Sequence, residues 1–139
     1  MVNKIAKGRS KELLCQKEYI SYMSKLPNNP KLLSKWRATR NIIKTKKGYF
    51  AFQNDLFNDW DLAFLYKEVF NDTNNEANII HLIQVKKGYT EEVYNELKAG
   101  KPYMSKAYLA VYDSKPRDKP IAIELPHFWL IEVEQRDIA

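Results

Sequence analysis

The segments Asp61-Leu-Ala-Phe-Leu-Tyr66 and His81-Leu-Ile-Gln-Val-Lys86 decide the fold that this sequence predicts. Each is an apolar run of the length of a β-strand, and the polar stretch Phe70-Asn-Asp-Thr-Asn-Asn-Glu76 separates them. We expect residues 61–66 and 78–86 to form an antiparallel hairpin with a turn centred near Asp72. The numbers of paired residues would then sum to about 145.

Polar residues stand in this hairpin at positions where burial is expected. The predicted register sets Asp61 opposite Gln84, and Lys86 follows two residues later on the same face as Gln84. An acid, an amide and a lysine would therefore meet at one end of a small sheet. This combination is typical of a site for a metal ion and a phosphate. His81 has the other parity and is expected to pack on the opposite face.

Length and composition limit the class of protein. The 139 residues, 45% of them hydrophobic, predict a single folded domain over residues 1–139. The formal charge of +6 favours a polyanionic partner. Cys15 is the sole cysteine, which excludes an intrachain disulfide and predicts a buried, inert thiol. No apolar run reaches the length of a membrane span and no signal peptide is visible, so we expect a soluble cytoplasmic protein without a membrane partner.

The rest of the chain predicts a small mixed sheet flanked by helices, an α/β fold. Apolar residues recur at helical spacing from Gly8 to Lys25, and Thr90 is placed to cap a second helix that Gly100 and Pro102 end. The other expected strands are residues 36–43, 49–52, 107–112, 121–123 and 128–133.

Glu12 extends the candidate site. It lies on one stripe of the first helix with Cys15, Tyr19 and Met23, and we expect it to lean over the sheet towards Asp61. Two carboxylates and the Gln84 amide oxygen would give Mg²⁺ or Mn²⁺ the oxygen ligands that such ions take. Lys86 would hold an attacking water or offset charge on the phosphate. Taken one at a time, these residues also fit roles without function: an acid on the surface, a glutamine at a strand end and a lysine whose amine reaches solvent.

The order Lys7-Gly8, Glu12, Asp61 and Gln84-Val-Lys86 resembles the PD-(D/E)xK nuclease superfamily, whose fold is restriction-endonuclease-like. It is also similar to archaeal Holliday-junction resolvases, in which a Lys-Gly helix with a glutamate precedes an Asp strand and a Glu-x-Lys strand. The likeness covers roughly residues 7–87 and is closest to a branch with Gln-x-Lys. It implies a Mg²⁺-dependent endodeoxyribonuclease of double-stranded or branched DNA, with Glu12, Asp61, Gln84 and Lys86 as catalytic residues and the first three as metal ligands.

Two departures keep other functions open. Gln84 stands where the superfamily usually has an acid, and Trp60 stands where a proline is expected before Asp61. One alternative is a catalytically inactive nucleic-acid-binding module of the same fold. Another is a small structural or interaction protein whose polar strand ends face water.

Basic residues near the first helix and in the stretch after residue 36 predict a surface for DNA phosphates, although a merely solvated basic loop fits as well. A homodimer is a further expectation, because cutting both strands of a duplex suits two-fold symmetry. The candidate nucleic-acid-binding residues are Arg9, Lys11, Arg37, Arg40, Lys44, Lys46, Lys47 and Lys87.

Overall fold

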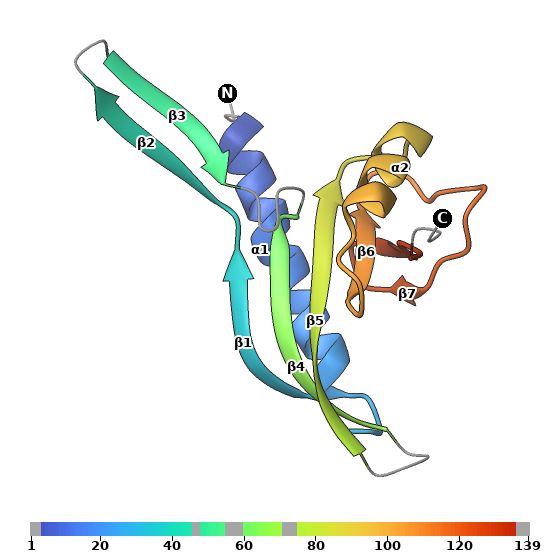
Figure 1. Ribbon diagram of the computed structural model, residues 1–139. Helices are drawn as coiled ribbons and strands as arrows, with labels where there is room; N and C mark the ends of the chain where they lie inside the picture. Colours follow the sequence, from blue (N-terminus) through green and yellow to red (C-terminus); the bar gives the residue numbers. More distant parts are fainter. Residues whose placement is uncertain (1–3, 46–47, 55–59, 71–74, 136–139) are drawn as a thin grey trace.

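A computed structural model describes residues 4–45, 48–54, 60–70 and 75–135 of the chain (Figure 1). The side chains that it describes are those of residues 10–38, 60–70 and 75–135. The expected turn near Asp72 lies outside the described residues, as do Lys46 and Lys47.

The structure is mixed α/β, with a six-stranded sheet, a separate two-stranded sheet and two helices (Figure 1). The strands of the large sheet lie in the order β1-β4-β5-β6-β8-β7, and β2 pairs with β3 in the small one. In chain order the elements are α1 (Lys4–Ser24), β1 (Lys31–Arg37), β2 (Thr39–Thr45), β3 (Gly48–Asn54), β4 (Leu62–Phe70), β5 (Asn75–Lys86), α2 (Glu91–Gly100), β6 (Lys106–Val111), β7 (Ile123–Glu124) and β8 (Trp129–Glu132).

The predicted hairpin is present as strands β4 and β5. They pair antiparallel from Leu62↔Ile83 to Phe70↔Asn75, and each pair of residue numbers sums to about 145, as antiparallel pairing about that turn requires. Both strands are longer than expected at the turn end. Because side chains alternate along a strand, the correct register also assigns every residue of the hairpin to its face of the sheet.

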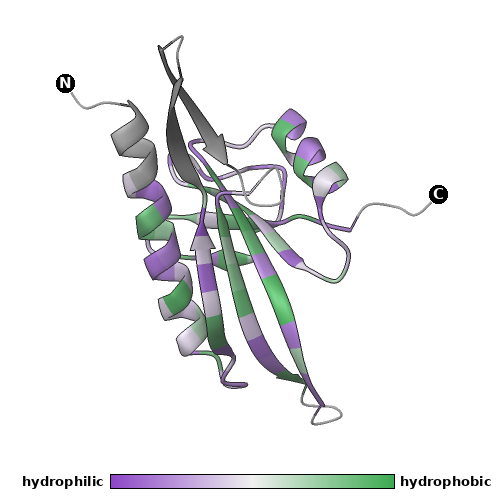
Figure 2. Ribbon diagram, turned by 60° about the vertical axis from the view of Figure 1, so that its left-hand side comes forward, coloured by the Kyte–Doolittle hydropathy of each residue, from purple (hydrophilic) through white to green (hydrophobic). Residues whose placement is uncertain are grey.

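One face of the large sheet packs against α1. Cys15, Tyr19 and Met23 of the helix lie in one buried cluster with Leu62, Phe64 and Ile83 of β4 and β5. Figure 2 shows that α1 alternates between hydrophilic and hydrophobic residues, as a helix does when one of its sides is buried. This packing was expected for the helix predicted over Gly8–Lys25, although α1 begins four residues earlier, at Lys4.

The other face packs against α2. Leu82 of β5, Ala107 and Leu109 of β6 and Tyr94 and Leu97 of α2 form a second buried cluster. The helix begins after Thr90, whose hydroxyl accepts a hydrogen bond from the Val93 N–H at 3.2 Å. The sequence predicted this residue as the cap of the helix. It ends at Gly100. The sheet is therefore covered by a different helix on each side.

The single strand expected over residues 36–43 is wrong. β1 ends at Arg37, β2 begins at Thr39, and the two belong to different sheets. The reason is the partner strand: Arg37 pairs with Leu62, the first residue of β4, so the large sheet offers no ladder beyond it. From Thr39 the chain pairs instead with β3, in a two-stranded ribbon that projects from one end of the molecule (Figure 1).

Candidate functional site

Asp61 lies at the junction of three strands. Its N–H donates to the Ile83 carbonyl at 3.1 Å, and its own carbonyl accepts from the Ala38 N–H at 2.8 Å. The Val85 N–H donates to the carboxylate oxygen Oδ2 at 2.9 Å. With 4% of its surface exposed, Asp61 is a buried acid whose carboxylate is held beside the end of β5.

Gln84 and Lys86 flank the amide that Asp61 binds. The side-chain oxygen of Gln84 is buried and has no hydrogen-bond partner among the described residues. An unsatisfied buried oxygen costs about 1–3 kcal/mol, so its presence calls for an explanation. Lys86 is exposed at the last position of β5. These two residues and Asp61 thus meet at one end of β5.

Glu12 lies on α1, one turn before Cys15. Burial is the main cause that raises the pKa of the Cys15 thiol, and the carboxylates of Glu18, Asp61 and Glu12 raise it further. Glu12 and Asp61 are therefore both near this thiol. The same observation confirms that Cys15 is buried and unreactive, because only the thiolate is a nucleophile.

The sheet lies between α1, which contains Glu12, and the side chains of Gln84 and Lys86. Ile83 and Val85 pack on the α1 side, so alternation assigns Gln84 and Lys86 to the other face, beside Leu109 and Val111 of β6. Glu12 belongs to α1, which covers the opposite face. Glu12 therefore does not lean over Gln84 and Lys86, and the four can converge only around the end of the sheet. Their meeting at one cation stays a prediction.

The predicted metal site would consist of oxygen donors, as a hard cation requires. No group of three or more histidine, cysteine, aspartate or glutamate side chains is arranged to hold a metal ion within the described part of the chain. Mg²⁺ often takes one or two carboxylates and several waters. Asp61 and Gln84, with Glu12 as the second acid, could supply such a site, and the unpartnered Gln84 oxygen is an acceptor that a cation would satisfy.

Three of the predicted nucleic-acid-binding residues have described side chains. Lys11 lies over the Tyr112 ring, with its Nζ 5.0 Å from the ring centroid. Arg37 is opposite Leu62 at the Asp61 end of β1, and its buried Nη1 has no hydrogen-bond partner among the described residues. Lys87 is exposed directly after β5. The side chains of Arg9, Arg40, Lys44, Lys46 and Lys47 lie outside the described residues.

A second group of polar residues, buried except for Lys106, was not predicted from the sequence. The Tyr19 hydroxyl is hydrogen-bonded to His81 Nδ1, His81 Nε2 lies 3.1 Å from Glu68 Oε2, and Lys106 Nζ donates to Glu68 Oε1 at 2.9 Å. Because the carboxylate can only accept, the proton of a neutral His81 lies on Nε2 and the tyrosine donates to Nδ1. The sequence did contain a sign of this group, because Glu68 is a charged residue at one of the alternate positions of β4 that face the core. The expectation that His81 packs opposite Gln84 is confirmed.

No helix in the described part of the chain is both long enough and apolar enough to cross a membrane.

Comparisons of the chain with protein-family models, with curated proteins and with solved structures find no match.

Proposed function

We propose that this chain is a metal-dependent DNA endonuclease of the PD-(D/E)xK type, with Asp61, Gln84 and Lys86 at the cleavage site and Glu12 at its border. The observation that carries the proposal is the bond from the Val85 N–H to the Asp61 carboxylate, which holds that acid beside the end of β5, where Gln84 and Lys86 stand on either side of Val85 in the chain. The substrate class is double-stranded or branched DNA, Holliday junctions included.

The order of elements supports the proposal. A helix with Glu12 comes first, Asp61 immediately precedes β4, and Gln84-Val-Lys86 ends β5, which pairs with β4. The resemblance implies the same order: first a helix with an acid, then a strand with an acid, and last a strand in which an acid or amide stands two residues before a lysine. The projecting β2–β3 ribbon contains Arg40 and Lys44. It begins at Thr39, directly after Ala38, whose N–H donates to the Asp61 carbonyl.

Unsatisfied polar groups at this end of the sheet also support it. The Gln84 oxygen is an acceptor without a partner and Arg37 Nη1 is a donor without one, in the part of the chain that the structure describes. A cation would satisfy the first group and a phosphate oxygen the second.

A bound Mg²⁺ or Mn²⁺ would supply charge that offsets the phosphate and acidifies a water for hydrolysis. Asp61 would be the principal ligand, because its carboxylate is already oriented by Val85. Lys86, exposed and two residues beyond Gln84, would face the phosphate or hold the attacking water. Glu12 would supply the second acid from α1.

A catalytically inactive DNA-binding module is the second candidate. The observation that favours it is the position of the sheet between α1, which contains Glu12, and the side chains of Gln84 and Lys86, together with Gln84 in place of an acid. Such a module would keep Arg37 and Lys87 for phosphate contacts and would lose the need for a metal.

The deciding experiment incubates the purified protein with labelled four-way junction, flap, duplex and single-stranded DNA in Mg²⁺, Mn²⁺ or EDTA. Cleavage of duplex or branched DNA that requires the metal supports the nuclease. Salt-sensitive binding without cleavage in either metal supports the inactive module. Absence of both cleavage and binding rejects both proposals. Lys31→Ala is a suitable control for the effect of a lost positive charge, because Lys31 pairs with Lys67 at the far end of β1 from Asp61.

A further inference from the structure

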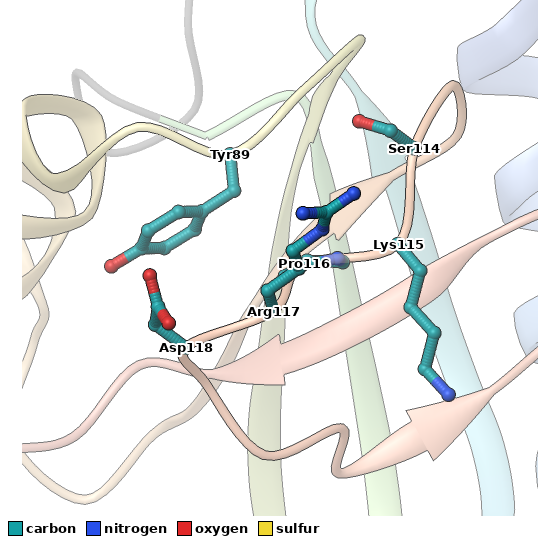
Figure 3. Close-up of a pocket in the computed structure, with 6 residues that line it drawn as sticks. All are labelled: Tyr89, Ser114, Lys115, Pro116, Arg117 and Asp118. Carbon is teal, nitrogen blue, oxygen red and sulfur yellow. The ribbon is translucent and has the colours of Figure 1, made fainter.

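A pocket opens where the turn after β5 meets the loop after β6 (Figure 3). Its volume is about 830 Å³, and the residues that line it are Tyr89, Ser114, Lys115, Pro116, Arg117 and Asp118. None of the candidate site residues lines it. The pocket therefore calls for a role of its own.

The pocket lies close to the proposed cleavage site. Strands β5 and β6 are parallel, with Lys86 paired to Val111, and both the β5–α2 turn and the β6–β7 loop leave from these carboxyl ends. The Asp113 N–H donates to the Lys87 carbonyl at 3.0 Å, so the first residues after the two strands are hydrogen-bonded to each other. Ligands of α/β sheets commonly bind outside the carboxyl ends of parallel strands. Tyr89 follows Lys86 by three residues, so their Cα atoms lie within about 11 Å of each other.

Arg117 gives the pocket a cation that is available to a ligand. In Figure 3 its guanidinium lies between the Tyr89 ring and the Ser114 hydroxyl. Arg117 is exposed, and no ion pair ties it to another residue in the part of the chain that the structure describes. A guanidinium presents several N–H donors in a plane, an arrangement that matches phosphate oxygens.

Lys115 differs from Arg117 although both belong to the same loop. Its side chain runs away from Tyr89 and Ser114 (Figure 3). The two residues carry the same charge, so a substitution of Lys115 reproduces the change in net charge that a substitution of Arg117 makes. Lys115 is therefore a matched control for the geometry of the pocket.

The carboxylate in the pocket lies at the end away from Arg117. Asp118 points towards the Tyr89 hydroxyl in Figure 3. Burial is the main cause that raises the pKa of Tyr89, and the carboxylates of Glu91 and Asp118 raise it further. Tyr89 therefore stays protonated and neutral at physiological pH, and the negative charge of Asp118 faces this side chain rather than the guanidinium.

We propose that this pocket binds a phosphodiester group of the DNA backbone, with Arg117 as the main contact and the Ser114 hydroxyl as a second donor. The proposal rests on the proposed function, and it adds a contact that orients the substrate strand across the carboxyl ends of β5 and β6. Because the pocket and Lys86 lie at the same carboxyl ends of β5 and β6, the phosphate that it binds would be near the cleaved bond along the strand.

The first test measures binding of a labelled duplex or junction in EDTA over a series of salt concentrations. Loss of one phosphate contact lowers the slope of log affinity against log salt by about one. We expect Arg117→Gln to produce this change and Lys115→Gln to produce less than about half of it. Equal slopes for the two variants would overturn the proposal. Unfolding temperatures of both variants, expected to match that of the wild type, exclude a loss of folding.

The second test finds the phosphate. Single uncharged methylphosphonates are placed along each strand on both sides of the cleaved bond. In the wild type we expect a weakening of about five- to tenfold at one position, the loss of one charge-assisted contact, and in Arg117→Gln a change below about twofold at the same position. A position-by-position profile that is the same in both proteins would overturn the proposal.

The outcomes separate this proposal from the proposed function. Metal-dependent cleavage by the wild type, with an unaltered salt slope in Arg117→Gln, rejects the phosphate subsite and keeps the nuclease. Failure of the wild type to bind DNA rejects both. Binding of inorganic phosphate that Arg117→Gln abolishes, without any effect of the methylphosphonates, assigns the pocket to a free phosphate and overturns the assignment to DNA.

Discussion

Strands β4 and β5 bury polar groups in two places, and the two differ in how completely those groups are bonded. On the α1 side, Tyr19, His81, Glu68 and Lys106 form a continuous chain of hydrogen bonds and ion pairs. At the strand ends, Asp61 binds one amide of β5, while the Gln84 oxygen beside it has no partner among the described residues. A satisfied network stabilises a fold by itself, whereas an unsatisfied one is typical of a site that awaits a ligand.

The largest expected effect tests the strand-end group. Asp61→Ala should reduce cleavage by a factor of about 10² to 10³ or more, as loss of a group that offsets charge at the reacting phosphate does. DNA binding should stay the same or tighten, because a negative charge near the phosphates is removed. Rates and affinities of the variant, measured beside those of Lys31→Ala, check this. Cleavage by Asp61→Ala at the wild-type rate would remove the assignment.

Lys86→Ala should reduce cleavage to a similar extent, by a factor of about 10² or more. It should not tighten DNA binding, because a cation that faces the phosphate is lost. The contrast between the two variants in binding is the specific prediction. An equal gain in affinity for both would show that Lys86 does not face the DNA.

The next effect tests the satisfied network. His81→Leu leaves the Tyr19 hydroxyl and one oxygen of Glu68 without a partner in the core, and it should lower the free energy of unfolding by about 2–4 kcal/mol. Cleavage per folded molecule should not change. Chemical denaturation provides the measurement. The comparison variant is His127→Leu, which should cost less, because the His127 side chain is 61% exposed and Glu18 keeps its hydrogen bond from the His127 N–H.

A smaller effect distinguishes a ligand from a packing residue at Gln84. Gln84→Met removes a buried oxygen that has no partner among the described residues, and it should raise the free energy of unfolding by about 1 kcal/mol while it lowers cleavage at least about tenfold. The same exchange at Gln16 of α1 is the control for the stability change.

Gln84→Glu is the complementary variant. If Gln84 binds the metal, this variant keeps activity or shifts the preference between Mg²⁺ and Mn²⁺, which metal-dependent rates would reveal. If Gln84 only packs, the added buried charge destabilises the fold.

The smallest effect is the dependence of stability on pH. Burial lowers the pKa of His81 from 6.5, although Glu68 opposes the shift. Burial acts to raise the pKa of Glu68, but hydrogen bonds from Lys106 and His81 outweigh it and hold that pKa below 4.5. Both pKa values are thus lower in the folded chain, so the unfolded chain binds more protons and stability falls as the pH falls. The loss begins near pH 6.5 with His81 and continues below pH 4.5 with Glu68.

Thermal unfolding between about pH 8 and pH 4 measures this dependence. His81→Leu should lose the part of it that begins near pH 6.5. An unfolding temperature that is constant over this range would contradict the picture of a neutral histidine bonded to a charged glutamate.

Local patterns predicted much of the fold. Alternation and the polar break were enough for the register of β4 and β5, and the Thr90 cap was enough for the start of α2. The division between β1 and β2 was not predictable, because Trp36 to Ile43 alternates as one strand would. It depends on where β4 begins, which is a long-range pairing.

The candidate site was predictable in part for a similar reason. The proximity of Asp61 to Gln84 follows from the register alone. The face on which α1 packs does not, because a helix stripe that contains Glu12 and Cys15 fits either side of the sheet. The Tyr19–His81 bond, which joins residues 62 positions apart in the sequence, was likewise beyond local reasoning.

The sequence by itself determined the strands of the hairpin, their register and the polar residues at its end, because these depend on neighbours along the chain and on the two-residue period of a strand. Only the tertiary structure decided which residues face α1, where the pocket of Arg117 opens, and which buried polar atoms find partners. Those features depend on the packing of distant segments, and the period of a helix or strand specifies a buried side without specifying what covers it.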